Sequence, residues 1–334
     1  MKVGIVGASG ETGQSIANGL LQSRETFDIT GFVRPASIDK AEVQSIKQQG
    51  VTIVPFELDA PHEKLVEALT GQDVVISCII PFAADAQNAL ADAAKAAGVN
   101  RFVPSYFGPI SPPDGVMALR EIKEAALNHV KKIYLPYTVI DIGWWYQSSL
   151  PRLPSGKIDY AMRFPVANMY GDGNFPSALT DLRDVGKYVA RIISDPRTLN
   201  KSVFVHNETW TQEQIFTLLE KASGETVARD YLSRTDIETA IAAARKPYYE
   251  QEQSVANLLG LAVLQYPHSV WLRGDNLPKS AEYLGYLDGK ELYPDVETVK
   301  FEDYVAEVLA GKGKAPYAGR TFGFEIKKDD GDTN

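Results

Sequence analysis

The chain has 334 residues, 44% hydrophobic and 23% charged, a globular composition with room for one large domain or two modest ones. Its 43 acidic and 34 basic side chains leave a net charge of −9, which argues against a nucleic-acid groove. A single cysteine excludes a disulfide framework and a cysteine-based zinc site, and four scattered histidines argue against a catalytic metal. No apolar run reaches the roughly 18 residues of a membrane span, and the first β-rich run begins too close to Met1 for a leader peptide. We therefore expect a cytoplasmic protein without nucleic-acid or membrane partners.

Short β-rich runs alternate with amphipathic helical stretches through the first 150 residues. This alternation predicts a parallel sheet with helices on both faces, because each right-handed crossover lays its helix on one face. Six strands predict a doubly wound α/β fold of the Rossmann, dinucleotide-binding type, with strand order 3-2-1-4-5-6. The predicted strands are 2–7, 27–34, 51–58, 73–80, 101–107 and 137–143, and the predicted helices are 11–24, 37–48, 61–70, 84–97 and 116–132.

The alternation breaks after the sixth predicted strand, where aromatic and proline-containing loops begin. We expect residues 1–150 to form the dinucleotide-binding domain and residues 151–326 a smaller, interwoven α/β lobe that binds the substrate. No flexible linker separates them, and a helix and strand within 181–207 are predicted to return to the first domain. The polar residues 327–334 read as a tail.

Three glycines, Gly7, Gly10 and Gly13, stand between the first predicted strand and the first predicted helix. Glycines let the backbone approach a pyrophosphate, and a helix N-terminus offers free N–H donors. Ser9 and Thr12 can add hydroxyl contacts. A tight turn without a ligand is the alternative, but the strand–turn–helix context favours a cofactor. The loop residues predicted to bind the cofactor are Gly7, Ala8, Ser9, Gly10, Glu11, Thr12 and Gly13.

The end of the second predicted strand indicates which cofactor binds. NAD-specific sites place a carboxylate there, whereas this strand ends at Arg34 and its acidic Asp28 lies at the other end. Arg34, helped by Lys40, can pair with a 2′-phosphate, although a solvated surface arginine is the alternative. The sequence therefore predicts NADP(H). The remaining predicted cofactor contacts are Ile79, Pro81 and Lys123.

Lys123 interrupts an apolar face of the fifth predicted helix. At about 100° per residue, Leu119, Ala126 and Val130 form one stripe, and Lys123 falls in its middle. A lysine there must pair, serve a cleft, or extend its amine to water along an apolar stem. Because the helix follows the fifth strand, we favour a cleft at the nicotinamide end of the site.

The Tyr-x-x-x-Lys pair of short-chain dehydrogenases is absent, since Leu119 stands four residues before Lys123. A further proton donor would have to come from elsewhere. Tyr106, Tyr146 and Tyr134 are candidates, and we carry Tyr106 and Tyr146 forward as possible catalytic residues.

The chain resembles the NmrA-like, isoflavone-reductase-like group of atypical short-chain reductases, and its later segments look most like fungal members. Arg34 and Lys123 match that group, and so do segments spread over nearly the whole chain. These segments are VGASGETG (6–13), AAKAAGVNRFVPSYFG (93–108), LPYTVIDIGWW (135–145), GDGN (171–174), LRDVGKYVARIISDPRTLNK (182–201), RGDN (273–276) and AEYLGYLDGKELYPD (281–295).

The resemblance implies that Lys123 acts as general acid/base beside the nicotinamide. The group commonly has P-S-E-F-G where this chain has P-S-Y-F-G, so Tyr106 replaces a carboxylate near the reacting centre. The resemblance also places a substrate pocket after the sixth strand, where adjacent tryptophans suggest a flat aromatic ligand or, alternatively, core packing. The predicted substrate-binding residues are Tyr106, Phe107, Trp144, Trp145 and Tyr146.

These observations predict an NADPH-dependent reductase of an aromatic or heterocyclic small molecule, belonging to secondary metabolism and acting as a monomer or homodimer. Two alternatives stay open. One is an NADP-binding enzyme that catalyses a redox-neutral condensation or cyclisation, which the replacement at Tyr106 favours. The other is an NADP-sensing regulator, which Lys123 argues against because the regulatory branch of the group tends to lack it.

Overall fold

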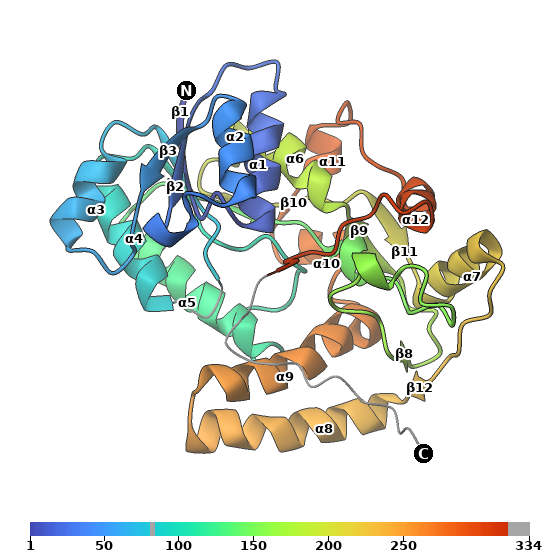
Figure 1. The fold of residues 1–334 in the computed structure, drawn as a ribbon. Coiled ribbons are helices and arrows are strands. Elements are labelled where there is room, and N and C mark those ends of the chain that lie inside the picture. Colours follow the sequence, from blue (N-terminus) through green and yellow to red (C-terminus); the bar gives the residue numbers. More distant parts are fainter. Residues whose placement is uncertain (81–83, 320–334) are drawn as a thin grey trace.

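The computed structural model of the protein describes residues 1–80 and 84–319, so the predicted tail at 327–334 lies outside it. Two lobes pack against each other, and the N-terminal one contains the main sheet (Figure 1). Within the described residues, no helix is both long and apolar enough to cross a membrane.

Parallel strands form the main sheet of the N-terminal lobe. Five of them are β1 (Lys2–Val6), β2 (Asp28–Val33), β3 (Thr52–Pro55), β4 (Val74–Ser77) and β5 (Arg101–Val103), in the order β3-β2-β1-β4-β5. Next to β5 lies β6 (Thr138–Asp141), joined to it through a parallel bridge between Phe102 and Tyr137. The doubly wound α/β fold is thereby confirmed, with the predicted order 3-2-1-4-5-6. Two later strands extend the sheet, because β10 (Lys201–Phe204) pairs with β6 and β13 (Leu287–Asp288) pairs with β10.

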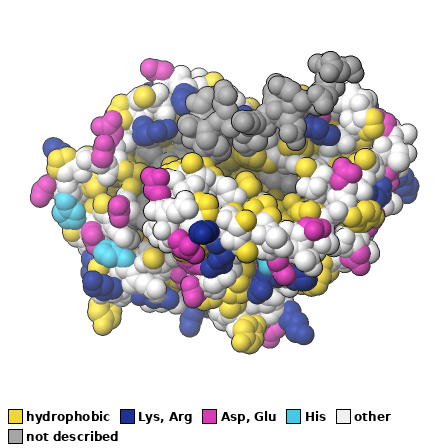
Figure 2. Space-filling view, turned by 90° about the horizontal axis from the view of Figure 1, so that it is seen from below, with side chains coloured by type: hydrophobic (Ala, Val, Ile, Leu, Met, Phe, Trp, Pro, Cys, Tyr) yellow, Lys and Arg dark blue, Asp and Glu magenta, His cyan; other side chains and the backbone are white. Residues whose placement is uncertain are grey.

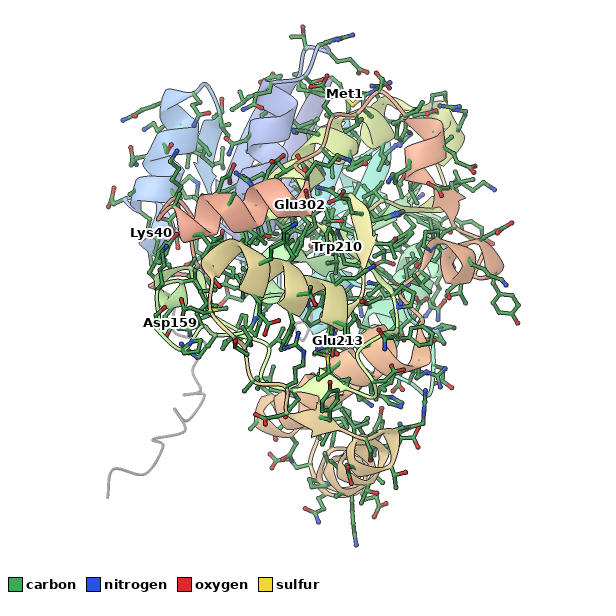
Figure 3. The ribbon with its side chains drawn as sticks, turned by 90° about the vertical axis from the view of Figure 1, so that its right-hand side faces the viewer. Met1, Lys40, Asp159, Trp210, Glu213 and Glu302 are labelled. Atoms are coloured by element: carbon green, nitrogen blue, oxygen red, sulfur yellow. The ribbon has the colours of Figure 1, made fainter. Side chains whose placement is uncertain are left out.

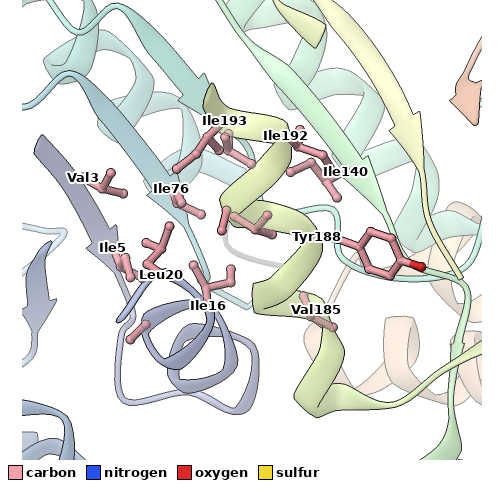
Figure 4. Close-up of a cluster of buried hydrophobic side chains, with 14 of the residues drawn as sticks. Val3, Ile5, Ile16, Leu20, Ile76, Ile140, Val185, Tyr188, Ile192 and Ile193 are labelled. Carbon is pink, nitrogen blue, oxygen red and sulfur yellow. The ribbon is translucent and has the colours of Figure 1, made fainter. Parts of the chain in front are cut away.

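Helices cover both faces of this sheet because its side chains alternate between two apolar cores. On one face, Val3 and Ile5 pack with α1 (Glu11–Leu21), α2 (Ala41–Gln48) and α6 (Val185–Ser194) (Figure 4). On the other face, Val6 and Phe102 pack with α3 (His62–Leu69), α4 (Ala84–Ala96) and α5 (Ala118–Lys132). Parallel strands buried on both faces explain the continuous apolar runs in the sequence.

The α1 and α6 helices cross with almost no space between their backbones. A Cβ atom added to Gly19 of α1 would lie 2.1 Å from the carbonyl carbon of Gly186, and one added to Gly186 would lie 1.9 Å from the Ser15 carbonyl oxygen. The Gly186 N–H also donates to the Ser15 hydroxyl at 3.1 Å. Glycine at both positions permits this approach, so α6 packs directly on the helix that follows the glycine loop.

The second lobe has short strands and the remaining helices around its own apolar core. Its small sheets have the orders β11-β9-β7 and β12-β8. In Figure 1, α8 and α9 lie beneath the rest of the molecule, and α9 packs on α5. The elements are β7 (Trp144–Trp145), β8 (Met169–Tyr170), β9 (Ser177–Thr180), β11 (Glu208–Trp210), α7 (Gln212–Ser223), β12 (Tyr231–Leu232), α8 (Arg234–Lys246), α9 (Val255–Pro267), α10 (Pro278–Tyr283), α11 (Gly289–Leu292) and α12 (Phe301–Leu309).

Candidate active site

The glycine loop turns sharply from β1 into α1. Gly7 has φ 85°, and a Cβ atom there would lie 2.7 Å from the carbonyl oxygen of Cys78. A Cβ atom on Gly13 would lie 2.4 Å from the Gly7 oxygen, whereas one on Gly10 would lie 3.2 Å from it. Gly7 and Gly13 are therefore required by the turn itself, and a side chain at Gly10 would also crowd the Gly7 carbonyl oxygen.

The start of α1 fits a phosphate. Gly10 is its N-cap residue and supplies no side-chain hydrogen bond, so the first-turn N–H groups keep their capacity to bind an anion. Ala8 is fully buried and packs in the core of the N-terminal lobe. Ser9 and Thr12 are half-buried at the loop surface. A pyrophosphate held by backbone groups is consistent with this arrangement.

Arg34 follows β2 at the same edge of the sheet as the glycine loop, because Val6 at the end of β1 pairs with Phe32. The side chains of Arg34 and Lys40 are exposed, and neither has a hydrogen bond or ion pair within the described residues. Two unpaired cations at this edge fit a 2′-phosphate. Asp28, at the opposite end of β2, cannot hold a ribose at this edge.

Lys123 lies over the carboxyl ends of β4 and β5. Its amine donates a hydrogen bond to the carbonyl oxygen of Tyr106, and the surrounding burial lowers the pKa of Lys123 to about 8. The amine borders a small cavity whose walls are mainly apolar. The residues lining this cavity are Ile80, Gln87, Pro104, Ser105, Tyr106, Ile122, Lys123 and Ala126.

Sequence reasoning missed a polar side chain in this cavity, Gln87 of α4. Its carbonyl oxygen accepts from the Ser77 hydroxyl at 3.1 Å and from the Ser105 N–H at 3.3 Å. Its amide nitrogen is buried and has no partner among the described residues. An unpaired buried donor costs free energy, so this nitrogen is suited to an acceptor atom of a ligand.

A buried charged cluster beneath Lys123 was also missed. Arg120 pairs with Asp141 at 2.8 Å and with Glu124 at 2.9 Å, and the Tyr286 hydroxyl donates to Asp141 at 2.7 Å. The Arg120 guanidinium lies 4.7 Å from the centre of the Tyr106 ring. Two signals were present in the sequence: a carboxylate inside an apolar strand, and an Arg–Glu pair four residues apart on one helix. We call Tyr106, Arg120, Glu124, Asp141 and Tyr286 the Arg120 cluster.

The Tyr106 ring contacts two cations, with its centre 4.7 Å from the Arg120 guanidinium and 5.7 Å from the Lys123 amine. It is 3% exposed, and its hydroxyl has no hydrogen-bond partner among the described residues. Burial raises the pKa of Tyr106 far above its ordinary value, which makes the phenol a poor proton donor. The residue also contributes its backbone carbonyl to Lys123, and a catalytic role of its hydroxyl stays a prediction.

Two further predicted site residues are core residues in the structure. Tyr146 is fully buried, packs edge-on against Phe301, and donates its hydroxyl to Glu208 at 3.2 Å. Phe107 is 6% exposed and belongs to the core beneath the main sheet. Their burial leaves them no access to a ligand at Lys123, so we withdraw the catalytic role of Tyr146 and the substrate contacts expected of both.

Trp144 and Trp145 point to different lobes, as adjacent residues in a strand do. The Trp145 ring packs on the core of the N-terminal lobe, and its centre lies 6.0 Å from that of Tyr317. The Trp144 ring faces Tyr266 of α9 at 5.9 Å, and Tyr266 packs in the same apolar cluster as Ile122 of α5. Figure 2 shows hydrophobic side chains gathered around a hollow on the underside of the molecule, where α8 and α9 lie.

Ile79 and Pro81 are the last two predicted cofactor contacts. Ile79 is half-buried behind β4, and its carbonyl oxygen accepts from the Ser105 hydroxyl at 2.7 Å. Pro81 lies outside the described residues. Ile79 therefore stands next to the cavity wall, between the glycine-loop edge and Lys123.

A second, open groove of about 410 Å³ lies on the outside of the second lobe, beside Trp210, Glu213 and Glu302 (Figure 3). Its Glu213 is already paired with Arg229 at 3.0 Å. Within residues 1–80 and 84–319, no three His, Cys, Asp or Glu side chains are grouped to hold a metal ion. The cavity at Lys123 is therefore the better candidate for chemistry.

A doubly wound sheet with a glycine turn at the carboxyl end of β1 defines a Rossmann-type protein. Residues 1–305 match the model of the NmrA-like family, and the chain belongs to that family. The predicted resemblance is thereby confirmed.

Relatives with assigned names extend over almost the whole chain. An asnovolin J 5′,6′-dehydrogenase of Aspergillus novofumigatus is 46% identical over 318 residues, which cover 93% of this chain and 96% of that protein. A phenylcoumaran benzylic ether reductase of Ginkgo biloba is 27% identical, covering 91% and 98% of the two chains. The solved structure of AtPrR2 with NADP+ and (+)-pinoresinol is 26% identical, with a TM-score of 0.71 and coverage of 91% and 97%.

Proposed function

We propose that this protein is an NADP(H)-dependent oxidoreductase that acts on an aromatic or heterocyclic small molecule of secondary metabolism. The observation that carries the proposal is the Lys123 amine, which borders a largely apolar cavity and has its pKa lowered to about 8. Such a group exchanges a proton near neutral pH, as interconversion of a carbonyl and an alcohol requires. Relatives named as a dehydrogenase and a reductase support an oxidoreductase.

The chain offers a fitting site for NADP(H). The backbone of residues 7–13 would hold the pyrophosphate, because the first turn of α1 has no side-chain cap and its N–H groups can bind an anion. Arg34 and Lys40, both unpaired within the described part of the chain, would hold the 2′-phosphate. When bound, the nicotinamide supplies or accepts the electron pair of the reaction.

Lys123 would donate a proton to the substrate oxygen or accept one from it. One of its protons is engaged by the Tyr106 carbonyl, which fixes the amine at the cavity wall and leaves its other positions for a ligand. In the reducing direction the ammonium donates a proton, and in the oxidising direction the neutral amine accepts one. The Gln87 amide nitrogen supplies a second donor without titrating.

The substrate class is argued from the apolar and aromatic side chains near Lys123. Ile122 and Ala126 of α5 line the cavity beside Lys123, and Tyr266, which meets the Trp144 ring, packs in the same apolar cluster as Ile122. Flat, mostly apolar molecules bind such surfaces well. The AtPrR2 complex, which contains (+)-pinoresinol, supports an aromatic ligand for this family.

The test is titration with NADPH and NADP+, followed by a screen of aromatic and heterocyclic metabolites for a change in nicotinamide absorbance. Lys123→Met is the matched variant, because methionine keeps most of the apolar stem and removes the amine. We expect NADP(H) binding in both proteins and turnover only in the wild type. Absence of NADP(H) binding would refute the proposal.

Two other outcomes would select the alternatives. Product formation with no net change in nicotinamide absorbance would select the redox-neutral condensation or cyclisation. Cofactor binding without turnover of any candidate, together with a change in the binding of a protein partner, would select the NADP-sensing role. The same samples, run on a sizing column with light scattering, would decide between monomer and homodimer.

A further inference from the structure

The chain returns to the glycine loop after its last helix. Residues 313–319, which we call the C-terminal strap, run from the end of α12 toward the first turn of α1 (Figure 1). The Gly313 N–H donates to the Tyr160 hydroxyl at 2.9 Å, which ties the strap to the second lobe. At its other end, the Tyr317 N–H donates to the Glu11 carboxylate at 2.9 Å. The strap therefore bridges the second lobe and the helix that follows the glycine loop.

Three contacts place the strap against the predicted dinucleotide site. Besides the bond from Tyr317, the Lys314 amine lies 3.8 Å from the second oxygen of the Glu11 carboxylate. The Tyr317 ring meets Trp145, which packs on the same core as Ala8 of the glycine loop. The match to the family model ends at residue 305, so none of these strap residues lies within it.

Glu11 explains why such a strap is useful. It is the first residue of α1, where a bound pyrophosphate would sit, and a carboxylate there repels phosphate. The Tyr317 N–H and the Lys314 amine engage both carboxylate oxygens and offset their charge. The side chain of Glu11 is 14% exposed, so solvent screens this repulsion less than at an open surface.

We infer that the C-terminal strap is a wall of the dinucleotide site, in which Lys314 and Tyr317 position Glu11 and slow the release of NADP(H). The inference rests on the proposed function, because it takes NADP(H) as the ligand of the glycine loop. Lys314 contributes charge, and Tyr317 contributes its N–H and its aromatic contact with Trp145.

The test measures the dissociation constant and the dissociation rate of NADPH by fluorescence in four proteins: the wild type, Lys314→Gln, Tyr317→Asn and Lys312→Gln. Lys312 has the same charge and an exposed side chain without a partner in the described structure, so it controls for long-range electrostatics. Asparagine tolerates the left-handed conformation of Tyr317, φ 57°, and therefore removes the ring while keeping the turn. Melting temperatures verify that each variant is folded.

We expect Lys314→Gln to weaken NADPH binding about threefold, the scale of one partly exposed ion pair. Tyr317→Asn should speed dissociation by about threefold to tenfold, the worth of an aromatic contact. In a Glu11→Gln background the effect of Lys314→Gln should disappear, because the charge that it offsets is gone.

Equal binding by the strap variants and Lys312→Gln would overturn the inference while leaving the proposed function intact. Tighter binding by the strap variants would also overturn it, because the strap would then obstruct the site. A wild type that does not bind NADP(H) would overturn both the inference and the proposed function. Loss of the Lys314 effect in the Glu11→Gln background supports the inference, and its persistence there refutes the role given to Glu11.

Discussion

Lys123→Met separates the two contributions of this lysine, the packing of its stem and the chemistry of its amine. Burial lowers the pKa of Lys123 from 10.5 to about 8, so a protonated amine at pH 7 costs the folded protein up to about 3 kcal/mol. Methionine removes that cost but leaves the Tyr106 carbonyl without its donor, which costs about 1 kcal/mol. The variant should therefore be more stable than the wild type at pH 7 by about 1–2 kcal/mol.

The stability gap should depend on pH in a defined direction. Between pH 8 and 10.5 the unfolded wild type holds the Lys123 proton more tightly than the folded protein does, so wild-type stability rises with pH in that window. The advantage of Lys123→Met is then fully present below pH 8 and is lost toward pH 10.5. Urea unfolding of both proteins at pH 7 and pH 10 measures this. A variant that is less stable than the wild type at pH 7 would refute the burial argument.

Turnover of the same variant tests the chemistry. A positioned acid/base contributes about two to four decades in rate, and Lys123→Met should lose that amount. Lys123→Arg should not restore the rate, because guanidinium stays protonated and is larger. In the wild type, reduction should slow above pH 8 and oxidation should speed up, since the two directions need opposite protonation states of the amine. Near-normal turnover in Lys123→Met would leave the lysine with packing or cofactor orientation as its role.

Arg34→Ala should weaken NADPH binding by about one to two decades and leave NADH binding unchanged, because one charge-assisted contact to the 2′-phosphate is lost. Titration of both cofactors measures these affinities, and equal affinities of the wild type for NADPH and NADH would contradict the prediction. Gly10→Val should abolish cofactor binding in calorimetry, because the valine methyl groups would fill the loop surface. The melting temperature should fall only slightly, since the added Cβ would lie 3.2 Å from the Gly7 oxygen. Undiminished binding would mean that no phosphate contacts this loop. Arg120→Met should destabilise the protein by about 3–5 kcal/mol in urea unfolding, because it leaves the Asp141 carboxylate buried without its ion-pair partner. Adding Asp141→Leu should recover most of the lost stability, and equal stability of the single and double variants would refute this.

The sheet and its helices could be predicted because local patterns fix them. The run 27–34 became β2 at Asp28–Val33, and the amphipathic stretch 116–132 became α5 at Ala118–Lys132. The apolar stripe of α5 shows where this reasoning reached its limit. Leu119 packs against α8 and α9, whereas Val130 packs under the main sheet. One continuous stripe thus meets two different partners, and Lys123 sits where one partner gives way to the other.

The rest of the site depends on contacts between distant parts of the chain. Tyr286 joins Arg120 from 166 residues away, and Tyr317 reaches Glu11 across 306 residues, so no spacing rule could have paired them. The prediction that Tyr146 belongs to the site was misled by the residues next to it in the sequence. Its neighbours in the sequence suggested a pocket, but its side chain is buried beside Phe301, which comes from the far end of the second lobe.

The glycine contact between α1 and α6 constrains when the N-terminal lobe can fold during synthesis on the ribosome. The helix that follows the glycine turn has its packing partner at Val185–Ser194, and the neighbour of β6 in the sheet is Lys201–Phe204. A nascent chain that has emerged only through β6 would expose the face of α1 around Gly19 and one edge of the sheet to solvent. The N-terminal lobe therefore completes its folding only after a large part of the second lobe has been synthesised, and a cut near residue 150 would not yield two independent folding units.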